Sequence, residues 1–189
     1  MSRSAANSVR IIGGRCRGRL IRFPASAGLR PTPDRVRETL FNWLGQDLIG
    51  RTTLELYAGS GALSLESLSR GAATAVAVDR DPKLVQALRD NAAALGLAGL
   101  EALRADAKAC IMREARSFDV IFLDPPFADA PWPWLLPASA ARLAPAGFIY
   151  AEAGRLLEAP AGLDLVRNAR AGEVYYHLLV PSEGMGIRG

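Results

Sequence analysis

The tetrapeptide Asp124-Pro125-Pro126-Phe127 places an acid, two prolines and an aromatic ring side by side. It follows the apolar run 118–123, which has the composition of a buried strand. The prolines fix φ at two successive residues and remove two backbone donors, so carbonyl oxygens remain as acceptors beside the carboxylate. Acceptors next to a flat ring suit a planar base that carries an amino group. A plain proline-terminated strand with a half-buried Phe127 fits the same residues, so the context has to decide.

A turn containing two glycines follows another predicted strand. Gly59 and Gly61 permit a tight strand-to-helix turn and close approach of a ligand, but Ser64 stands where the dinucleotide-binding pattern has its third glycine. Glu55 precedes the turn, where its charge disfavours a phosphate and can pair with an ammonium group. The turn therefore favours a cationic ligand over a pyrophosphate.

Two more acids follow the next two predicted strands. Asp79 is placed to bind the two hydroxyls of a ribose, and Asp106 follows the third strand. Taken singly, each acid also fits an ordinary helix N-cap. Taken together beside Gly-x-Gly, they describe a site for a nucleoside that carries a positively charged amino acid and no phosphate.

These residues need a sheet that brings strand ends together, and the chain from Thr52 onward alternates between strand and helix patterns. The predicted strands are 53–57, 73–78, 100–104, 118–123 and 147–151, and the helices are 62–69, 82–95, 107–116 and 134–143. Residues 163–167 and 174–180 flank a turn and indicate an antiparallel hairpin. We therefore expect an α/β, Rossmann-like fold with a mostly parallel seven-stranded sheet and a terminal antiparallel hairpin.

The N-terminal part of the chain is basic. Residues 1–51 contain ten Arg against three acids, so this part carries +7 while the whole chain carries +4. Residues 9–24 indicate two short strands joined by a glycine-rich turn, a β-ribbon suited to a phosphate backbone. Its expected RNA-binding residues are Arg10, Arg15, Arg17, Arg19 and Arg22. A solvated arm with no partner is the plainer alternative.

A helix is predicted after the ribbon, with Thr32 as N-cap, Pro33 at the first helical position and an apolar stripe from Val36 to Leu44. Arg30 and Arg35 cluster at its entrance, which favours a ligand contact there over a simple cap.

Length and composition bound the remaining possibilities. With 189 residues, 50% of them hydrophobic, the chain suits one domain at 25–182, with the ribbon at 9–24, a disordered tail at 1–8 and a frayed terminus at 183–189. Cys16 and Cys110 are expected to be free thiols, and no metal site is expected. With no secretory signal and no long apolar run, we expect a cytoplasmic protein.

The ordered motifs resemble those of class I S-adenosylmethionine-dependent methyltransferases. The Arg-rich ribbon, the segments 30–44 and 58–72, and Asp124–Phe127 together are similar to the bacterial 16S rRNA guanine-N2 methyltransferases, the RsmD family. The similarity extends from about Arg10 to Val180. One departure is Glu55, where the family commonly has Asp.

This resemblance implies S-adenosyl-L-methionine as cofactor and 16S rRNA, or a small-subunit assembly intermediate, as the partner of a monomer. It implies that Glu55 and the turn Ala58–Gly61 face the methionine part, Asp79 the ribose and Asp106 the adenine. It also implies that Thr32 and Arg35 help to close the cofactor pocket. Asp124 and the Pro125 carbonyl would accept hydrogen bonds from the target amine, and Phe127 would stack on the flipped base.

Three alternatives stay open at the level of sequence. A DNA or other RNA amino-methyltransferase acting on adenine N6 uses the same tetrapeptide. A non-catalytic nucleic-acid-binding protein with a vestigial body is the second, and a nicotinamide dehydrogenase, disfavoured by Ser64, is the third. His177, in an apolar strand, is expected to be packed or exposed at the sheet edge rather than catalytic. Trp132 and Trp134 either border the substrate cleft or anchor a loop.

Overall fold

The computed structural model describes residues 7–25 and 32–182. Strand β1 begins at Asn7, so the last two residues of the expected 1–8 tail belong to a strand. The rest of that tail, Arg30 and the expected frayed terminus at 183–189 lie outside the described residues.

A seven-stranded sheet in the order β5-β4-β3-β6-β7-β9-β8 forms the centre of the molecule. The first five strands in this order are parallel, and β9 pairs antiparallel with both β7 and β8, which confirms the predicted terminal hairpin. The strands are β3 (Thr52–Leu56), β4 (Thr74–Asp79), β5 (Leu100–Arg104), β6 (Phe118–Leu123), β7 (Leu143–Ala153), β8 (Leu163–Ala171) and β9 (Val174–Pro181).

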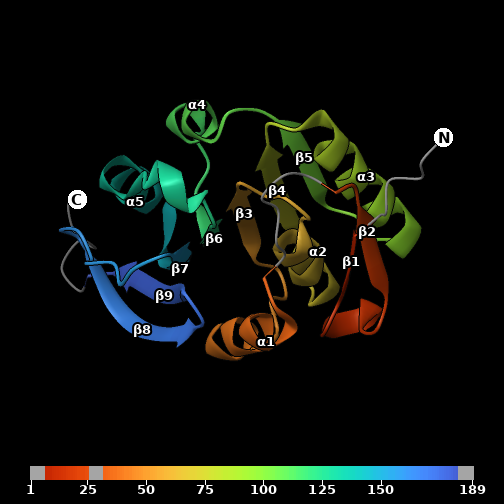
Figure 1. Cartoon of the computed structure of the whole chain (residues 1–189), viewed down its shortest axis with the longest axis horizontal. Coiled ribbons are helices and arrows are strands. Elements are labelled where there is room, and N and C mark those ends of the chain that lie inside the picture. The colour runs from red at the N-terminus through yellow and green to blue at the C-terminus, as the bar shows by residue number, and fades with distance from the viewer. Residues whose placement is uncertain (1–6, 26–31, 183–189) are drawn as a thin grey trace.

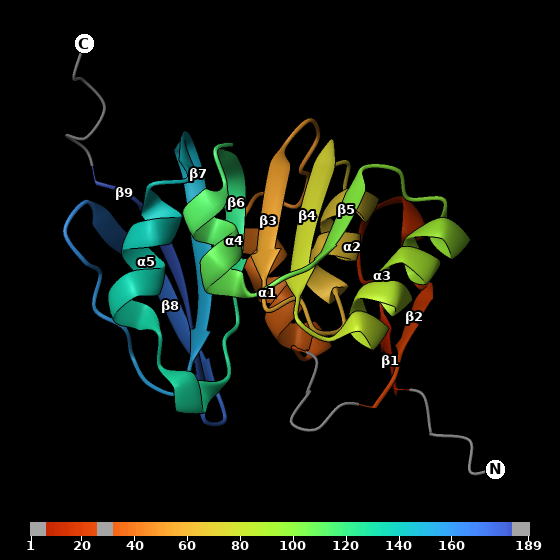
Figure 2. The ribbon, with the colours of Figure 1, turned by 90° about the horizontal axis from the view of Figure 1, so that it is seen from above.

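Helices cover both faces of this sheet (Figures 1 and 2). One face packs against α1, α2 and α3, and the other against α4 and α5, so two separate apolar cores result. The strands between the cores are buried on both sides, as expected for a parallel sheet. The helices are α1 (Asp34–Trp43), α2 (Ala62–Ser69), α3 (Pro82–Leu95), α4 (Ala107–Arg113) and α5 (Trp132–Ala140).

Several predicted bounds are corrected by local chemistry. Helix α4 stops at Arg113, three residues early, because Glu114 is extended and its carboxylate binds the backbone and side chain of Arg116. Helix α5 begins at Trp132, because Pro133 is tolerated in the first turn, and it continues through Pro137 to Ala140. Thr32 is not the N-cap of α1: Pro33 holds that position and no side chain caps the helix.

The N-terminal ribbon is present as antiparallel strands β1 (Asn7–Arg10) and β2 (Leu20–Phe23), with a short 3-10 helix, η1 (Gly14–Cys16), between them. It packs against the ends of α2 and α3 (Figure 1). The Cys16 amide donates to the Ser69 hydroxyl at 2.9 Å, and the Arg22 amide donates to the Asn91 side chain at 3.0 Å. The ribbon is therefore attached to the main domain by specific polar contacts.

A buried ion cluster joins the ribbon to α1 and α2. The Arg37 guanidinium is fully buried and donates to the Glu66 carboxylate at 3.2 Å and to the Arg10 carbonyl at 2.7 Å. Glu66 also accepts from the Arg70 side chain at 3.0 Å and from the Ile12 amide at 2.9 Å. The cluster thereby fixes the ribbon relative to the first two helices. Within residues 7–25 and 32–182, the structure contains no helix that is long and apolar enough to cross a membrane.

Candidate active site

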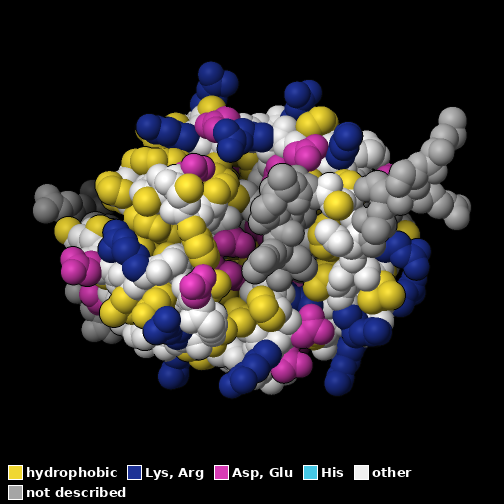
Figure 3. All heavy atoms as spheres, in the orientation of Figure 1, with side chains coloured by type: hydrophobic (Ala, Val, Ile, Leu, Met, Phe, Trp, Pro, Cys, Tyr) yellow, Lys and Arg dark blue, Asp and Glu magenta, His cyan; other side chains and the backbone are white. Residues whose placement is uncertain are grey.

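The chain order along the sheet reverses between β3 and β6. From β3 the chain runs outward through β4 and β5, then crosses over to β6 and continues through β7. In such sheets the crevice for ligands lies at the carboxyl ends of the two strands that flank the reversal. Figure 2 shows the strands lengthwise, and Figure 3 looks on to their carboxyl ends, where acidic side chains gather in the middle of the face beside hydrophobic ones.

The turn after β3 has a left-handed backbone at three residues, with φ of 62° at Tyr57, 54° at Gly59 and 68° at Gly61. Gly61 starts helix α2, and a Cβ atom there would lie 1.7 Å from Leu88 Cδ2 on α3. Positive φ at the non-glycine Tyr57 is uncommon and is often found at functional sites. The predicted need for glycine at position 61 is thus explained by both its φ and its packing.

Glu55 is the second-to-last residue of β3, and its side chain is directed at the start of α2. One carboxylate oxygen accepts from the Ser64 amide at 2.9 Å and also from the Ser64 hydroxyl. Burial raises the pKa of Glu55 to about 7, against the effect of the Ser64 hydrogen bonds and with a contribution from the charge of Asp79. Ser64 replaces the third glycine of the dinucleotide pattern, and its function here is to orient this acid.

Asp79, at the end of β4, connects two loops. One oxygen accepts from the Gly59 amide and the other from the Asp81 amide, both at 2.8 Å. Asp106 is exposed and accepts a hydrogen bond from the Ala109 amide at 3.0 Å, so it is the N-cap of α4. Each carboxylate retains lone pairs for a ligand.

Asp124, after β6, belongs to a group of three acids that includes Glu55 and Glu152. Burial raises the pKa of Asp124 well above its usual range, and the charges of Glu152 and Glu55 raise it further. Asp124 is partly exposed, and none of the hydrogen bonds within the described part of the chain involves its side chain. It therefore presents free acceptor atoms in an acidic, weakly solvated place.

Glu152, on β7, was not predicted from the sequence. Its Oε1 atom accepts from the Thr32 hydroxyl at 2.7 Å and from the Tyr150 hydroxyl at 2.8 Å. Burial raises the pKa of Glu152, whereas these two donors favour its ionised form. Thr32, which is expected to contact the cofactor, donates its hydroxyl hydrogen bond to this acid, which lies beside Asp124.

A cavity of about 250 Å³ lies beside the tetrapeptide. Phe127 is half exposed at its edge and its ring packs beside Gly154, where an added Cβ atom would be in ordinary van der Waals contact with the ring at 3.4 Å. Trp132 lines the cavity, whereas Trp134 stacks with Lys108 on the outside of α4 and α5. The lining consists of Pro125, Pro126, Phe127, Ala130, Trp132, Gly154 and Arg155.

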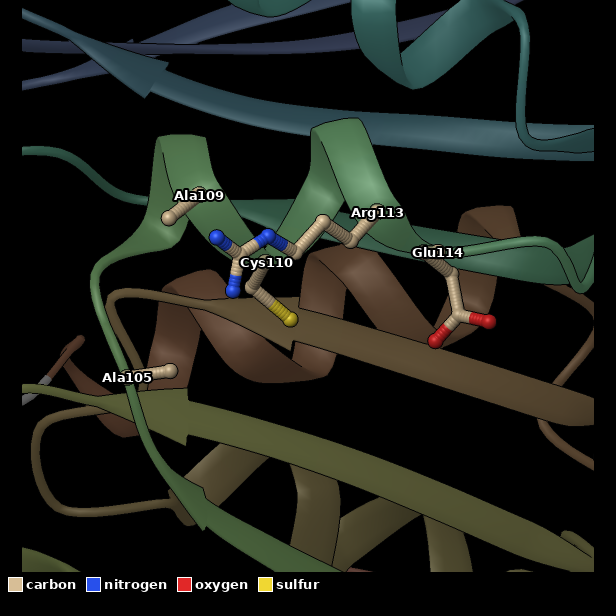
Figure 4. A pocket seen from close by; sticks show the side chains of 5 residues that line it. All are labelled: Ala105, Ala109, Cys110, Arg113 and Glu114. Atoms are coloured by element: carbon tan, nitrogen blue, oxygen red, sulfur yellow. The ribbon is translucent and has the colours of Figure 1, made fainter.

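A second cavity, of about 290 Å³, lies against α4 on the Asp106 side (Figure 4). Cys110, Arg113 and Glu114 project into it from the helix and its end. Burial raises the pKa of the Cys110 thiol, which makes it a poor nucleophile. Both cysteines are free, as predicted, and among the described residues no group of three or more His, Cys, Asp or Glu side chains is arranged to hold a metal ion.

The other predicted site residues are dispersed over the surface. The five ribbon arginines are all exposed, and dark blue side chains lie along the rim where β1 and β2 are found (Figure 3). Arg35 is exposed on α1. His177 is fully buried and holds the chain after β7, with Nε2 accepting from the Leu157 amide at 3.0 Å and Nδ1 facing the Ala151 carbonyl at 3.0 Å, which confirms a packing role.

Comparison with known proteins assigns the family. Residues 9–180 match the family model described as Conserved hypothetical protein 95. The chain is 38% identical over 184 residues to Ribosomal RNA small subunit methyltransferase D of Escherichia coli (strain K12), covering 93% of this chain and 91% of that protein.

Solved structures agree with this match. The structure of yhhF from Escherichia coli has a TM-score of 0.79 at 37% identity, covering 93% of this chain and 98% of that chain. One from Haemophilus influenzae has a TM-score of 0.78 at 31% identity, with coverages of 92% and 98%. The chain therefore belongs to the family described as Conserved hypothetical protein 95, the RsmD family of ribosomal RNA small subunit methyltransferases.

Proposed function

We propose that this protein transfers a methyl group from S-adenosyl-L-methionine to the exocyclic N2 amine of a guanine in small-subunit ribosomal RNA. The observation that carries the proposal is Asp124, a carboxylate with free acceptor atoms at the point where the strand order reverses, beside a cavity bordered by Phe127. The family relationship supports methyl transfer to ribosomal RNA over a dehydrogenase or a purely binding function.

The residues around the glycine turn fit this cofactor. Asp79 and Asp106 lie at successive strand ends with acceptor atoms available for ribose hydroxyls and an adenine amine. Glu55 and the neighbouring acids supply negative charge, which suits a sulfonium and an ammonium group and would repel a pyrophosphate. When bound, the cofactor supplies an electrophilic methyl group.

The chain's own residues then have to prepare a poor nucleophile, because the amine lone pair of guanine is delocalised into the ring. Asp124 and the Pro125 carbonyl accept its two N–H hydrogen bonds and align the lone pair with the methyl carbon. With the cofactor bound, the amine would take the methyl group as the C–S bond breaks with its electron pair left on sulfur, and Asp124 is placed to accept the proton that the amine would lose. Phe127 offers a stacking surface to the flipped base, worth about 1–3 kcal/mol.

The ribbon supports a nucleic-acid substrate. Its five arginines are all exposed and suit the shape-led contacts that RNA-binding proteins make with phosphates. We propose that the protein acts as a monomer on 16S rRNA, either free or within an assembling small subunit.

Transfer of tritium from labelled cofactor to small-subunit rRNA, assembling particles, tRNA and DNA, followed by nucleoside analysis, tests the proposal. We expect N2-methylguanine in rRNA only. Asp124→Ala should abolish turnover but retain cofactor affinity, and Asp90→Ala, an exposed acid on α3, should leave both unchanged. N6-methyladenine as the product, or near wild-type turnover by Asp124→Ala, would refute the assignment.

A further inference from the structure

The tetrapeptide alone does not select a base. Guanine, adenine and cytosine all carry an exocyclic amine, and the acceptors of Asp124 and Pro125 suit each of them. Selection therefore requires another group that senses the ring atom next to the amine. In guanine that atom is N1 with its hydrogen, whereas in adenine and cytosine it is a ring nitrogen with a lone pair.

Glu152 is placed to sense that atom. It is only 5% exposed, and it follows Ala151, which pairs with Leu123 in the parallel register of β6 and β7, so Glu152 lies next to Asp124. Burial raises the pKa of Asp124, and the charge of Glu152 adds to this effect. Oε1 is occupied by the Thr32 and Tyr150 hydroxyls, whereas Oε2 has no hydrogen-bond partner within residues 7–25 and 32–182. As a carboxylate oxygen it can accept an N–H hydrogen bond from a ligand.

The two hydroxyls that hold Oε1 also fix the orientation of the carboxylate. Thr32 comes from the entrance of α1 and Tyr150 from the same strand as Glu152, so the acid is held from two directions. Burial and the charge of Glu152 raise the pKa of the Tyr150 hydroxyl, which keeps it a hydrogen donor. Because both hydroxyls donate to Oε1, Oε2 is the carboxylate oxygen left for a ligand.

We propose that Glu152 is the specificity-determining residue, accepting the N1–H of the target guanine through Oε2 while Asp124 accepts a proton of N2. Two adjacent carboxylates match two adjacent donors, and guanine presents N1–H and N2–H side by side. Adenine or cytosine in the same pose directs a lone pair at Glu152 and is repelled. This inference rests on the proposed guanine methylation and adds the residue that selects guanine.

The test compares wild-type protein and Glu152→Gln on two RNA substrates. One carries guanine at the methylated position, and the other carries 2,6-diaminopurine, which keeps the C2 amine but has a lone pair at N1. Wild type should prefer guanine in kcat/KM by at least about a hundredfold, because a site built to bind an N–H group rejects the analogue without it. In Glu152→Gln the side-chain amide can donate to the N1 lone pair, so the preference should fall at least about tenfold.

Glu158→Gln, an exposed acid in the loop after β7, serves as the matched control and should keep the wild-type preference. Equal use of both substrates by wild type would overturn the inference, whatever the variant does. An equal loss on both substrates in Glu152→Gln would also overturn it, because the residue would then only support Thr32 and Tyr150. Absence of any guanine N2 methylation by wild type would instead refute the proposed function.

Discussion

Replacing Arg37 with methionine should destabilise the protein more than any surface change on α1. The side chain is fully buried and donates to the carbonyls of Thr32 and Arg10 and to the carboxylates of Glu66 and Asp34. Methionine fills much of the same volume but supplies no donor. Glu66, also fully buried, would lose one of its two cationic partners.

The contacts that remain set the size of the effect. Removing one partner of a buried ion pair costs about 3–5 kcal/mol. Glu66 would keep the Arg70 guanidinium and the Ile12 amide, and the Asp34 side chain is 53% exposed, so water can replace its lost partner. We therefore expect Arg37→Met to lower the free energy of unfolding by about 3 kcal/mol, the lower end of this range. With a urea m-value of about 2 kcal/mol/M, the unfolding midpoint should fall by about 1.5 M.

Urea unfolding followed by circular dichroism measures this shift. Arg35→Met, two residues earlier on the same helix but exposed, is the matched control and should change the free energy of unfolding by less than about 0.5 kcal/mol. A loss below about 1 kcal/mol in Arg37→Met would refute the reasoning, since it would mean that the cluster does not hold a desolvated charge.

Two further predictions concern the glycine turn. Gly61→Ala should lower the free energy of unfolding by roughly 1–3 kcal/mol, because φ is 68° and the new Cβ atom meets Leu88. An unchanged free energy of unfolding would contradict this packing. Cofactor affinity measured by calorimetry should rise from pH 6 to pH 8, because the pKa of Glu55 is about 7 and a cationic ligand favours its ionised form, so binding releases a proton. Glu55→Gln should reduce this pH dependence. If cofactor affinity in that variant changes with pH as steeply as in wild type, the released proton comes from another group.

The strands, the glycine turn and four of the site acids were predictable because their signals are local. A buried strand is a short apolar run, and an acid directly after it is directed to the sheet edge whatever the rest of the chain does. Asp79, Asp106 and Asp124 lie at the ends of the strands predicted before them, and Glu55 is the second-to-last residue of its strand. The Asp106 cap shows the limit of this reasoning, because an N-cap and a ligand-binding acid have the same sequence signature.

Glu152 and Arg37 were not predictable, because their roles depend on partners far away in the chain. Thr32 and Glu152 are 120 residues apart, and before the fold is known Thr32 before a proline has the pattern of a helix cap. Arg37 lies on a helix among other arginines, and no pattern distinguishes the one that is buried. Long-range polar pairs of this kind follow only from the three-dimensional packing.

The distribution of charge connects the ribbon to the acidic centre. Arg37 donates to the carbonyls of Arg10 in the ribbon and of Thr32 just before α1, and the Thr32 hydroxyl donates to Glu152 beside Asp124. The basic rim is therefore held at a fixed position from the three acids. A phosphate backbone is attracted to the rim and repelled from the centre. A neutral base bearing N–H donors is instead favoured at the acidic centre, because it can donate hydrogen bonds to the acids and stack on Phe127. The arrangement therefore favours a substrate whose backbone stays on the ribbon while one base turns inward, which a regular duplex cannot offer without base flipping.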